Sequence, residues 1–187
     1  MADMMNKTVL FLAVNGFEAR AFETLWSCFG NLNASTRIAS FNADDEIRSV
    51  DGIVNTRSDM SFNDAAVRMP GDQPFPDVVV IADNKTAEAI MNDDDALTII
   101  RDANDRGAAV VAIDDGVKAL IAADVISGRT VAAPRELSDE LQKVGAKLSE
   151  VPLAVSDNIF TAISEGDLMA LCNLVSDYIT GLEEEVA

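Results

Sequence analysis

Acidic side chains follow three apolar runs in this sequence, at places where they could work as a group. Asp114 and Asp115 come directly after one run, Asp83 follows another, and Glu18 lies shortly after a third. Two carboxyl groups held close together can share a proton, so that one donates it to a substrate while the other activates water. Carboxylate oxygens are also the ligands that Mg²⁺ and Ca²⁺ prefer. The residue types therefore indicate carboxyl acid–base chemistry or cation binding.

The composition argues against several other kinds of chemistry and partner. Histidine is absent, which removes the general base most often used near neutral pH. The two cysteines, Cys28 and Cys172, lie in amphipathic helical patterns, so we interpret both as small buried apolar residues and expect no disulfide framework. The net charge of -18 argues against nucleic acid and membrane as partners. The acidic start does not resemble a signal peptide, so we expect a cytoplasmic protein, and we expect no cofactor.

Strand-like and helix-like segments alternate along the chain. Parallel strands need crossover helices, and those helices must bury one face against the sheet. We therefore predict one domain over residues 1–187, an α/β three-layer sandwich whose mostly parallel sheet has helices on both faces. The expected strands are 7–14, 34–41, 77–82, 108–113 and 158–163, with short ones at 131–133 and 148–155. The expected helices are 18–29, 85–91, 96–104, 115 or 116 to 123, 135–144 and 166–182, with a hairpin-like excursion at 46–56 and a loop at 58–76.

The topology of such a sheet predicts where a site would lie. Ligands bind outside the carboxyl ends of parallel strands, which meet at one edge of the sheet. This rule selects the loops 15–18, 83–86 and 114–117, and these loops carry all of the acidic side chains named above.

Four segments, in order along the chain, carry a family resemblance. They are Val14-Asn15-Gly16-Phe17-Glu18, Val111-Ala112-Ile113-Asp114-Asp115-Gly116, Ser127-Gly128-Arg129-Thr130 and Ser156-Asp157-Asn158-Ile159-Phe160-Thr161. Together they resemble the ThiJ/PfpI superfamily, which includes the Parkinsonism-associated deglycase and is related to class I glutamine amidotransferase domains. The resemblance implies a flavodoxin-like fold and a homodimer, which many members form.

The centre of the resemblance departs from the family at the residues that do chemistry. Where the family has Ala-Ile-Cys-His-Gly at a nucleophile elbow, this chain has Asp114 and Asp115 in place of cysteine and histidine. The family's Pro-Gly-Gly, which helps to form an oxyanion-binding pocket, reads Ala82-Asp83-Asn84. The resemblance also places Glu18 under the elbow, facing Asp114. Because thiolate attack needs sulfur at the elbow, cysteine-based catalysis is expected to be absent.

Three hypotheses follow for the family's active-site positions Asp114, Glu18 and Asp115. The first is a pseudoenzyme, a non-catalytic homodimer with a structural, ligand-binding or regulatory role that could bind a small molecule. The second is a hydrolase or hydratase in which the Asp114/Glu18 pair supplies acid and base. The third gathers Glu18, Asp83, Asp114 and Asp115 around a divalent cation, for which Mg²⁺ or Ca²⁺ suits the oxygen ligands better than zinc does.

The charge states of the central pair can also be predicted. Two carboxyl groups in a partly buried site do not both ionise without cost, so we expect Glu18 and Asp114 to share a proton through a short hydrogen bond. We expect Asp114 to hold the charge, because a helix begins there and offers backbone N–H donors. Glu18 is then the protonated partner, with a raised pKa.

Overall fold

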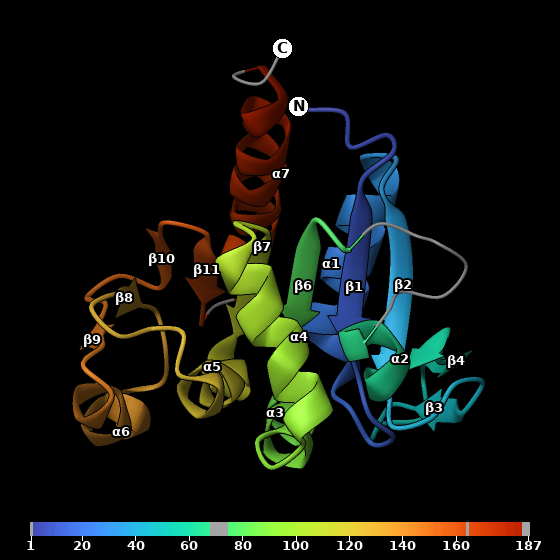
Figure 1. Ribbon diagram of the computed structural model, residues 1–187, viewed down its shortest axis with the longest axis horizontal. Coiled ribbons are helices and arrows are strands. Elements are labelled where there is room, and N and C mark those ends of the chain that lie inside the picture. Colours follow the sequence, from blue (N-terminus) through green and yellow to red (C-terminus); the bar gives the residue numbers. More distant parts are fainter. Residues whose placement is uncertain (1, 68–74, 164, 185–187) are drawn as a thin grey trace.

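A seven-stranded sheet built from the apolar runs forms the centre of the molecule (Figure 1). The computed structural model describes residues 2–67, 75–163 and 165–184. The strands of this sheet are β1 (Thr8–Leu12), β2 (Ser35–Ser40), β5 (Met60–Ser61), β6 (Val78–Ile81), β7 (Ala109–Ile113), β10 (Leu153–Ser156) and β11 (Ile159–Ala162). Their order is β10-β11-β7-β6-β1-β2-β5, and all neighbours are parallel except β10 and β11. The central strands β6 and β7 are buried along their whole length, which explains why they are continuous apolar runs.

Helices cover both faces of this sheet, as expected (Figure 1). Side chains alternate along β1, so that Val9 and Phe11 enter one core and Leu10 and Leu12 enter the other. The first core is closed by α1 (Ala19–Asn31) and α7 (Leu168–Glu184). The second is closed by α2 (Phe62–Val67), α3 (Asn84–Ile90), α4 (Asp94–Asp105) and α5 (Val117–Ala123). The fold is the three-layer, flavodoxin-like α/β arrangement, and among the described residues no helix is long and apolar enough to cross a bilayer.

Smaller elements lie outside the main sheet. The hairpin-like excursion forms β3 (Glu46–Arg48) and β4 (Asn55–Arg57), which pair in antiparallel fashion as predicted. A two-stranded parallel sheet of β8 (Thr130–Val131) and β9 (Lys147–Leu148) lies beside α6 (Ser138–Lys143). Three short 3₁₀ helices, η2 (Asp114–Gly116), η3 (Arg135–Leu137) and η4 (Glu165–Asp167), begin the segments that continue as α5, α6 and α7.

Two expectations about secondary structure were wrong in detail. The region 58–76, expected to be a loop with at most one turn of helix at its centre, contains the edge strand β5 and the six-residue helix α2, and its residues 68–74 lie outside the described part of the chain. The strand expected at 148–155 is divided between β9 and β10, because Pro152 lies between them and has no N–H to donate to a ladder. Neither difference affects the edge of the sheet where the acidic residues lie.

The cysteines correct a further expectation. Cys28 in α1 and Cys172 in α7 form a disulfide, with their Cα atoms 6.7 Å apart, although no disulfide framework was expected. Both residues are buried, as the helical patterns indicated, but they face the same seam where α1 packs against α7. The sequence pattern of each helix shows that its cysteine points inward. The same pattern does not show which residue the cysteine contacts across the core.

Candidate functional site

Asp114 lies at a sharp turn between β7 and the helical segment that follows it. Its φ is +53°, in the left-handed region, which aspartate tolerates better than most residues. The turn then continues through η2 into α5. Gly116 is buried at this turn, where a Cβ atom would lie 2.6 Å from the backbone carbonyl oxygen of Ile81 in β6. Glycine therefore lets the turn approach the neighbouring strand closely, which fixes Asp114 at the carboxyl edge of the sheet.

The carboxyl ends of the strands open into one small pocket beside Asp114. Its volume is about 160 Å³. The structure brings together at this pocket all four acidic residues that the topology placed at this edge, Glu18, Asp83, Asp114 and Asp115. They come from the loops after β1, β6 and β7, so the rule about the carboxyl ends of parallel strands located the site.

Asp83 has a structural task within this group. It is 3% exposed and is the N-cap residue of α3. Its Oδ1 accepts a hydrogen bond from the backbone N–H of Thr86 at 2.9 Å, and its Oδ2 accepts one from the Thr86 hydroxyl at 2.7 Å. Burial raises the pKa of Asp83, and these hydrogen bonds oppose that rise. Both oxygens of Asp83 are therefore occupied in holding the start of α3.

Lys118 supplies a positive charge beside the pocket. Its Nζ lies 3.2 Å from Asp115 Oδ1 and 3.5 Å from Glu88 Oε1, and it donates a hydrogen bond to Asn84 Oδ1 at 2.8 Å. Sequence reasoning missed this residue. The spacing from Asp115 to Lys118 on a predicted helix is a signal that could have found it, because residues three apart are neighbours on a helix surface.

An ion pair spans the outer side of the pocket. Arg20 Nη1 of α1 lies 2.8 Å from Glu165 Oε1 of η4, and both side chains line the pocket. Both are also largely exposed, so the pair contributes little to stability by itself. The two residues are 145 positions apart in the sequence, and no local pattern could have joined them.

Comparison with known proteins decides the family. The model of the DJ-1/PfpI family matches residues 7–177. The chain belongs to the DJ-1/PfpI family. An uncharacterized protein of Archaeoglobus fulgidus is 26% identical over 164 residues, which cover 88% of this chain and 93% of that protein.

Solved structures of other DJ-1/PfpI proteins share the fold. A two-domain protein of Anabaena variabilis, with DJ-1/ThiJ/PfpI-like and ferritin-like domains, superposes with a TM-score of 0.83 at 18% identity, covering 93% of this chain and 48% of that one. The chain thus spans about half of the Anabaena protein. A ThiJ/PfpI domain protein of Brachyspira murdochii gives 0.80 at 17% identity, covering 95% and 98%. DJ-1beta of Drosophila melanogaster gives 0.78 at 15% identity, covering 96% and 97%.

The cysteine sulfur atoms of this DJ-1/PfpI chain lie away from the elbow. Cys28 and Cys172 are the two cysteines of the sequence, and both belong to the disulfide between α1 and α7. Neither lines the pocket beside Asp114. The side chain at the elbow turn is the carboxyl group of Asp114, which cannot supply a thiolate.

The pKa of Glu18 is raised, in the expected direction. Burial raises the pKa of Glu18 first, and the negative charges of Asp83, Asp114 and Asp115 raise it further. Glu18 is nevertheless exposed, so it lies at the mouth of the pocket and not enclosed beneath the elbow. Its electrostatic interaction with Asp114 is present, and the short hydrogen bond between the two carboxyl groups stays a prediction.

The pKa of Asp114 shifts in the direction opposite to the one that helix N–H donors would cause. We expected such donors to favour its ionised form, but the pKa of this exposed residue is raised, first by burial and then by the charges of Asp115 and Glu136, with Lys118 opposing. The physical reason is its place in the turn. Asp114 is the first residue of η2 and not its N-cap residue, and no side-chain cap is made at the start of η2 or α5. Its carboxyl group therefore faces neighbouring acids without the compensation that a cap position would give.

The hypothesis of a divalent cation at this site is not supported. Within the described ranges, no three Asp, Glu, His or Cys side chains are placed so that they could hold one metal ion. Thr86 donates hydrogen bonds to both oxygens of Asp83, and the charge of Lys118 lies against Asp115.

Proposed function

We propose that this chain is a non-catalytic DJ-1/PfpI protein that reversibly binds a small molecule in the pocket beside Asp114. The observation that carries the proposal is the carboxyl side chain at the elbow turn, inside a pocket lined by further carboxyl groups. A carboxylate at this position cannot form the thioester or hemithioacetal that a thiolate forms. Both cysteines are committed to a distant disulfide, which further supports binding without a covalent step.

The charges of the pocket indicate the class of ligand. Glu18, Asp83, Asp114, Asp115 and Glu165 line it, and Arg20 is the basic residue that lines it with them. Because Arg20 is paired with Glu165, the remaining charge facing the pocket is negative. A small ammonium or guanidinium group would be attracted there, whereas a carboxylate would be repelled.

Binding of such a cation is expected to depend on pH through Glu18. Protonated Glu18 is neutral and attracts a cation less than ionised Glu18 does, so the affinity should rise as the pH rises through the raised pKa of Glu18. The protein is titrated with methylguanidinium and with methylammonium, and acetate is the anionic control. Binding is measured from the NMR shifts of the backbone amides of residues 18–20 and 114–116.

The NMR titrations have one expected result and two results that would contradict the proposal. We expect both cations, and not acetate, to shift these amides, and we expect Glu18→Gln to weaken binding and to reduce its pH dependence, of which Asp114 retains a part. Acetate that binds as well as the cations, or cations that shift no amide of the pocket, would contradict the proposal.

The second candidate is a hydrolase or hydratase that uses the Asp114/Glu18 carboxyl pair. The observation in its favour is that the pKa of both residues is raised, so each holds its proton to a higher pH than an ordinary carboxyl group does. Turnover of a substrate that is lost in both Asp114→Asn and Glu18→Gln would favour this reaction over binding alone.

We also propose a cytoplasmic homodimer. The dimer rests on the family resemblance, and the apolar side chains at the tip of the β3–β4 hairpin support it. Val50 and Ile53 are 73% and 74% exposed there. A groove lined by Phe22, Trp26 and Val54 lies beside them, so a second copy of the chain would find apolar surface to bury.

A further inference from the structure

The β3–β4 hairpin lies against the loop that carries Glu18. The chain leaves β2 and forms this hairpin outside the main sheet (Figure 1). It then returns to the sheet as the edge strand β5. Its strands pair Glu46 with Arg57 and Arg48 with Asn55. At its free end the hairpin meets the segment between β1 and α1, which contains the residues directly before Glu18.

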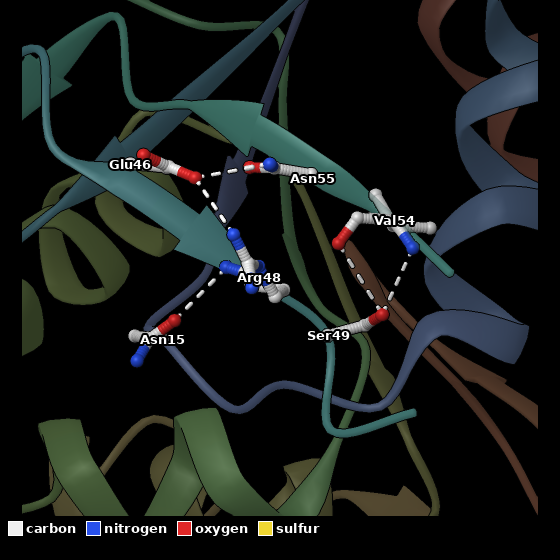
Figure 2. Close-up of polar contacts among 6 residues, drawn as sticks. All are labelled: Asn15, Glu46, Arg48, Ser49, Val54 and Asn55. Carbon is white, nitrogen blue, oxygen red and sulfur yellow. Dashed lines mark hydrogen bonds and ion pairs between the residues drawn. The ribbon is translucent and has the colours of Figure 1, made fainter. Parts of the chain in front are cut away.

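Three hydrogen bonds join the hairpin to three successive residues of this segment. The backbone N–H of Arg48 donates to Asn15 Oδ1 at 2.9 Å, and the backbone N–H of Gly16 donates to the Arg48 carbonyl at 2.8 Å. The backbone N–H of Val50 donates to the Phe17 carbonyl at 2.9 Å. Figure 2 shows the Asn15 side chain, in the segment between β1 and α1, pointing at the Arg48 backbone. Asn15 makes its hydrogen bond through its side chain, whereas Gly16 and Phe17 make theirs through backbone atoms.

Further hydrogen bonds connect the residues of the hairpin to one another. Glu46 Oε1 accepts hydrogen bonds from Arg48 Nη2 at 3.1 Å and from Asn55 Nδ2 at 3.0 Å, which links the two strands (Figure 2). Beyond them, the Ser49 hydroxyl accepts from the backbone N–H of Val54 at 3.0 Å. These bonds hold the Arg48 backbone at a fixed place beside Asn15.

The other side of the loop is also anchored. Phe17 is fully buried, and its ring lies 4.8 Å from that of Phe22 in α1. Gly16 turns the chain with φ +88°, a value that favours glycine. The backbone before Glu18 is thus held between the core on one side and the hairpin on the other.

We propose that Asn15 is a positioning residue, through which the β3–β4 hairpin holds Glu18 next to Asp83 and Asp114 in the pocket. The carboxyl interactions at the pocket weaken with distance, so Glu18 feels its acidic neighbours only while the loop keeps its place. This role goes beyond the proposed function, because it concerns the placement of Glu18 and holds whether or not a ligand binds.

The test compares the truncation of two asparagines that each make a hydrogen bond to the hairpin, Asn15 from the neighbouring loop and Asn55 from within the hairpin. Asn15→Ala removes the bond to the loop, whereas Asn55→Ala removes a bond to Glu46 and leaves the loop untouched. Both side chains are exposed, so neither truncation opens a cavity in the core. The readout is the pKa of Glu18, measured by ¹³C NMR of its carboxyl group as a function of pH. A loss of global stability without movement of the loop would not change this value.

In Asn15→Ala we expect the pKa of Glu18 to fall toward the ordinary glutamate value, while part of the rise remains because Gly16 and Phe17 keep their backbone hydrogen bonds to the hairpin. In Asn55→Ala we expect it to stay at the wild-type value. An unchanged pKa in Asn15→Ala, or an equal fall in both variants, would overturn the proposal. Asn15→Ser, whose shorter side chain cannot reach the Arg48 N–H in the same way, serves as a second variant and should behave like Asn15→Ala.

Discussion

Loss of the Cys28–Cys172 disulfide is expected to lower the free energy of unfolding by about 2–4 kcal/mol. The bond joins α1 to α7 across a sequence separation of 144 residues, so it restricts the unfolded chain over most of its length. Both residues are buried in the core on that face of the sheet, where α1 and α7 close the layer. Denaturant unfolding of the wild type and of the double variant Cys28→Ala/Cys172→Ala measures the difference.

Reduction of the wild type provides the matched control. In dithiothreitol the two thiols keep the volume of the disulfide, so a loss of stability comes from the missing bond and not from a cavity. We expect the reduced wild type to unfold at a lower denaturant concentration, and the double variant to be insensitive to dithiothreitol. Equal unfolding midpoints for oxidised and fully reduced wild type, with both thiols shown free by mass spectrometry, would contradict this role.

Gly116→Ala should cost about 1–3 kcal/mol of unfolding free energy, the range of a residue forced into a packed site. The added Cβ would lie 2.6 Å from the Ile81 carbonyl oxygen, and a backbone atom cannot move aside as a flexible side chain can. The turn would have to shift, and Asp114 would shift with it.

Gly30→Ala is the control for the change from glycine to alanine. Gly30 lies within α1, and a Cβ there would meet nothing within 4 Å. Because alanine has the higher helix propensity, we expect Gly30→Ala to leave stability unchanged or raise it by up to about 1 kcal/mol. Equal unfolding midpoints for the two variants would show that the close approach of Gly116 to β6 does not constrain the fold.

The sequence predicted the sheet because its central strands are covered on both faces. The runs that form β1, β6 and β7 are continuous and apolar for this reason, and their carboxyl ends carry the acidic residues of the pocket. The rule about these ends therefore found Glu18, Asp83 and Asp114 without any knowledge of their distances. The edge strand β5 escaped prediction because it has only two residues and pairs with one neighbour.

What the sequence could not predict depends on contacts between distant segments. The disulfide and the Arg20–Glu165 pair each join residues more than 140 positions apart. The direction of the pKa shift of Asp114 was predicted wrongly, because a residue at the start of a helical turn need not occupy the N-cap position, and the dihedral angles decide which position it occupies. Lys118 was missed although its spacing from Asp115 was visible.

The central claim is that Glu18 and Asp114 belong to one electrostatically coupled carboxyl pocket. The most direct test is a ¹³C NMR titration of the Glu18 carboxyl group in the wild type and in Asp114→Asn. We expect Glu18 to titrate above the ordinary glutamate pKa in the wild type, because burial and three acidic neighbours raise it. In Asp114→Asn its pKa should fall, though not fully to the ordinary value, since burial and Asp83 remain. An ordinary pKa of Glu18 in the wild type, or one that Asp114→Asn leaves unchanged, would contradict the claim.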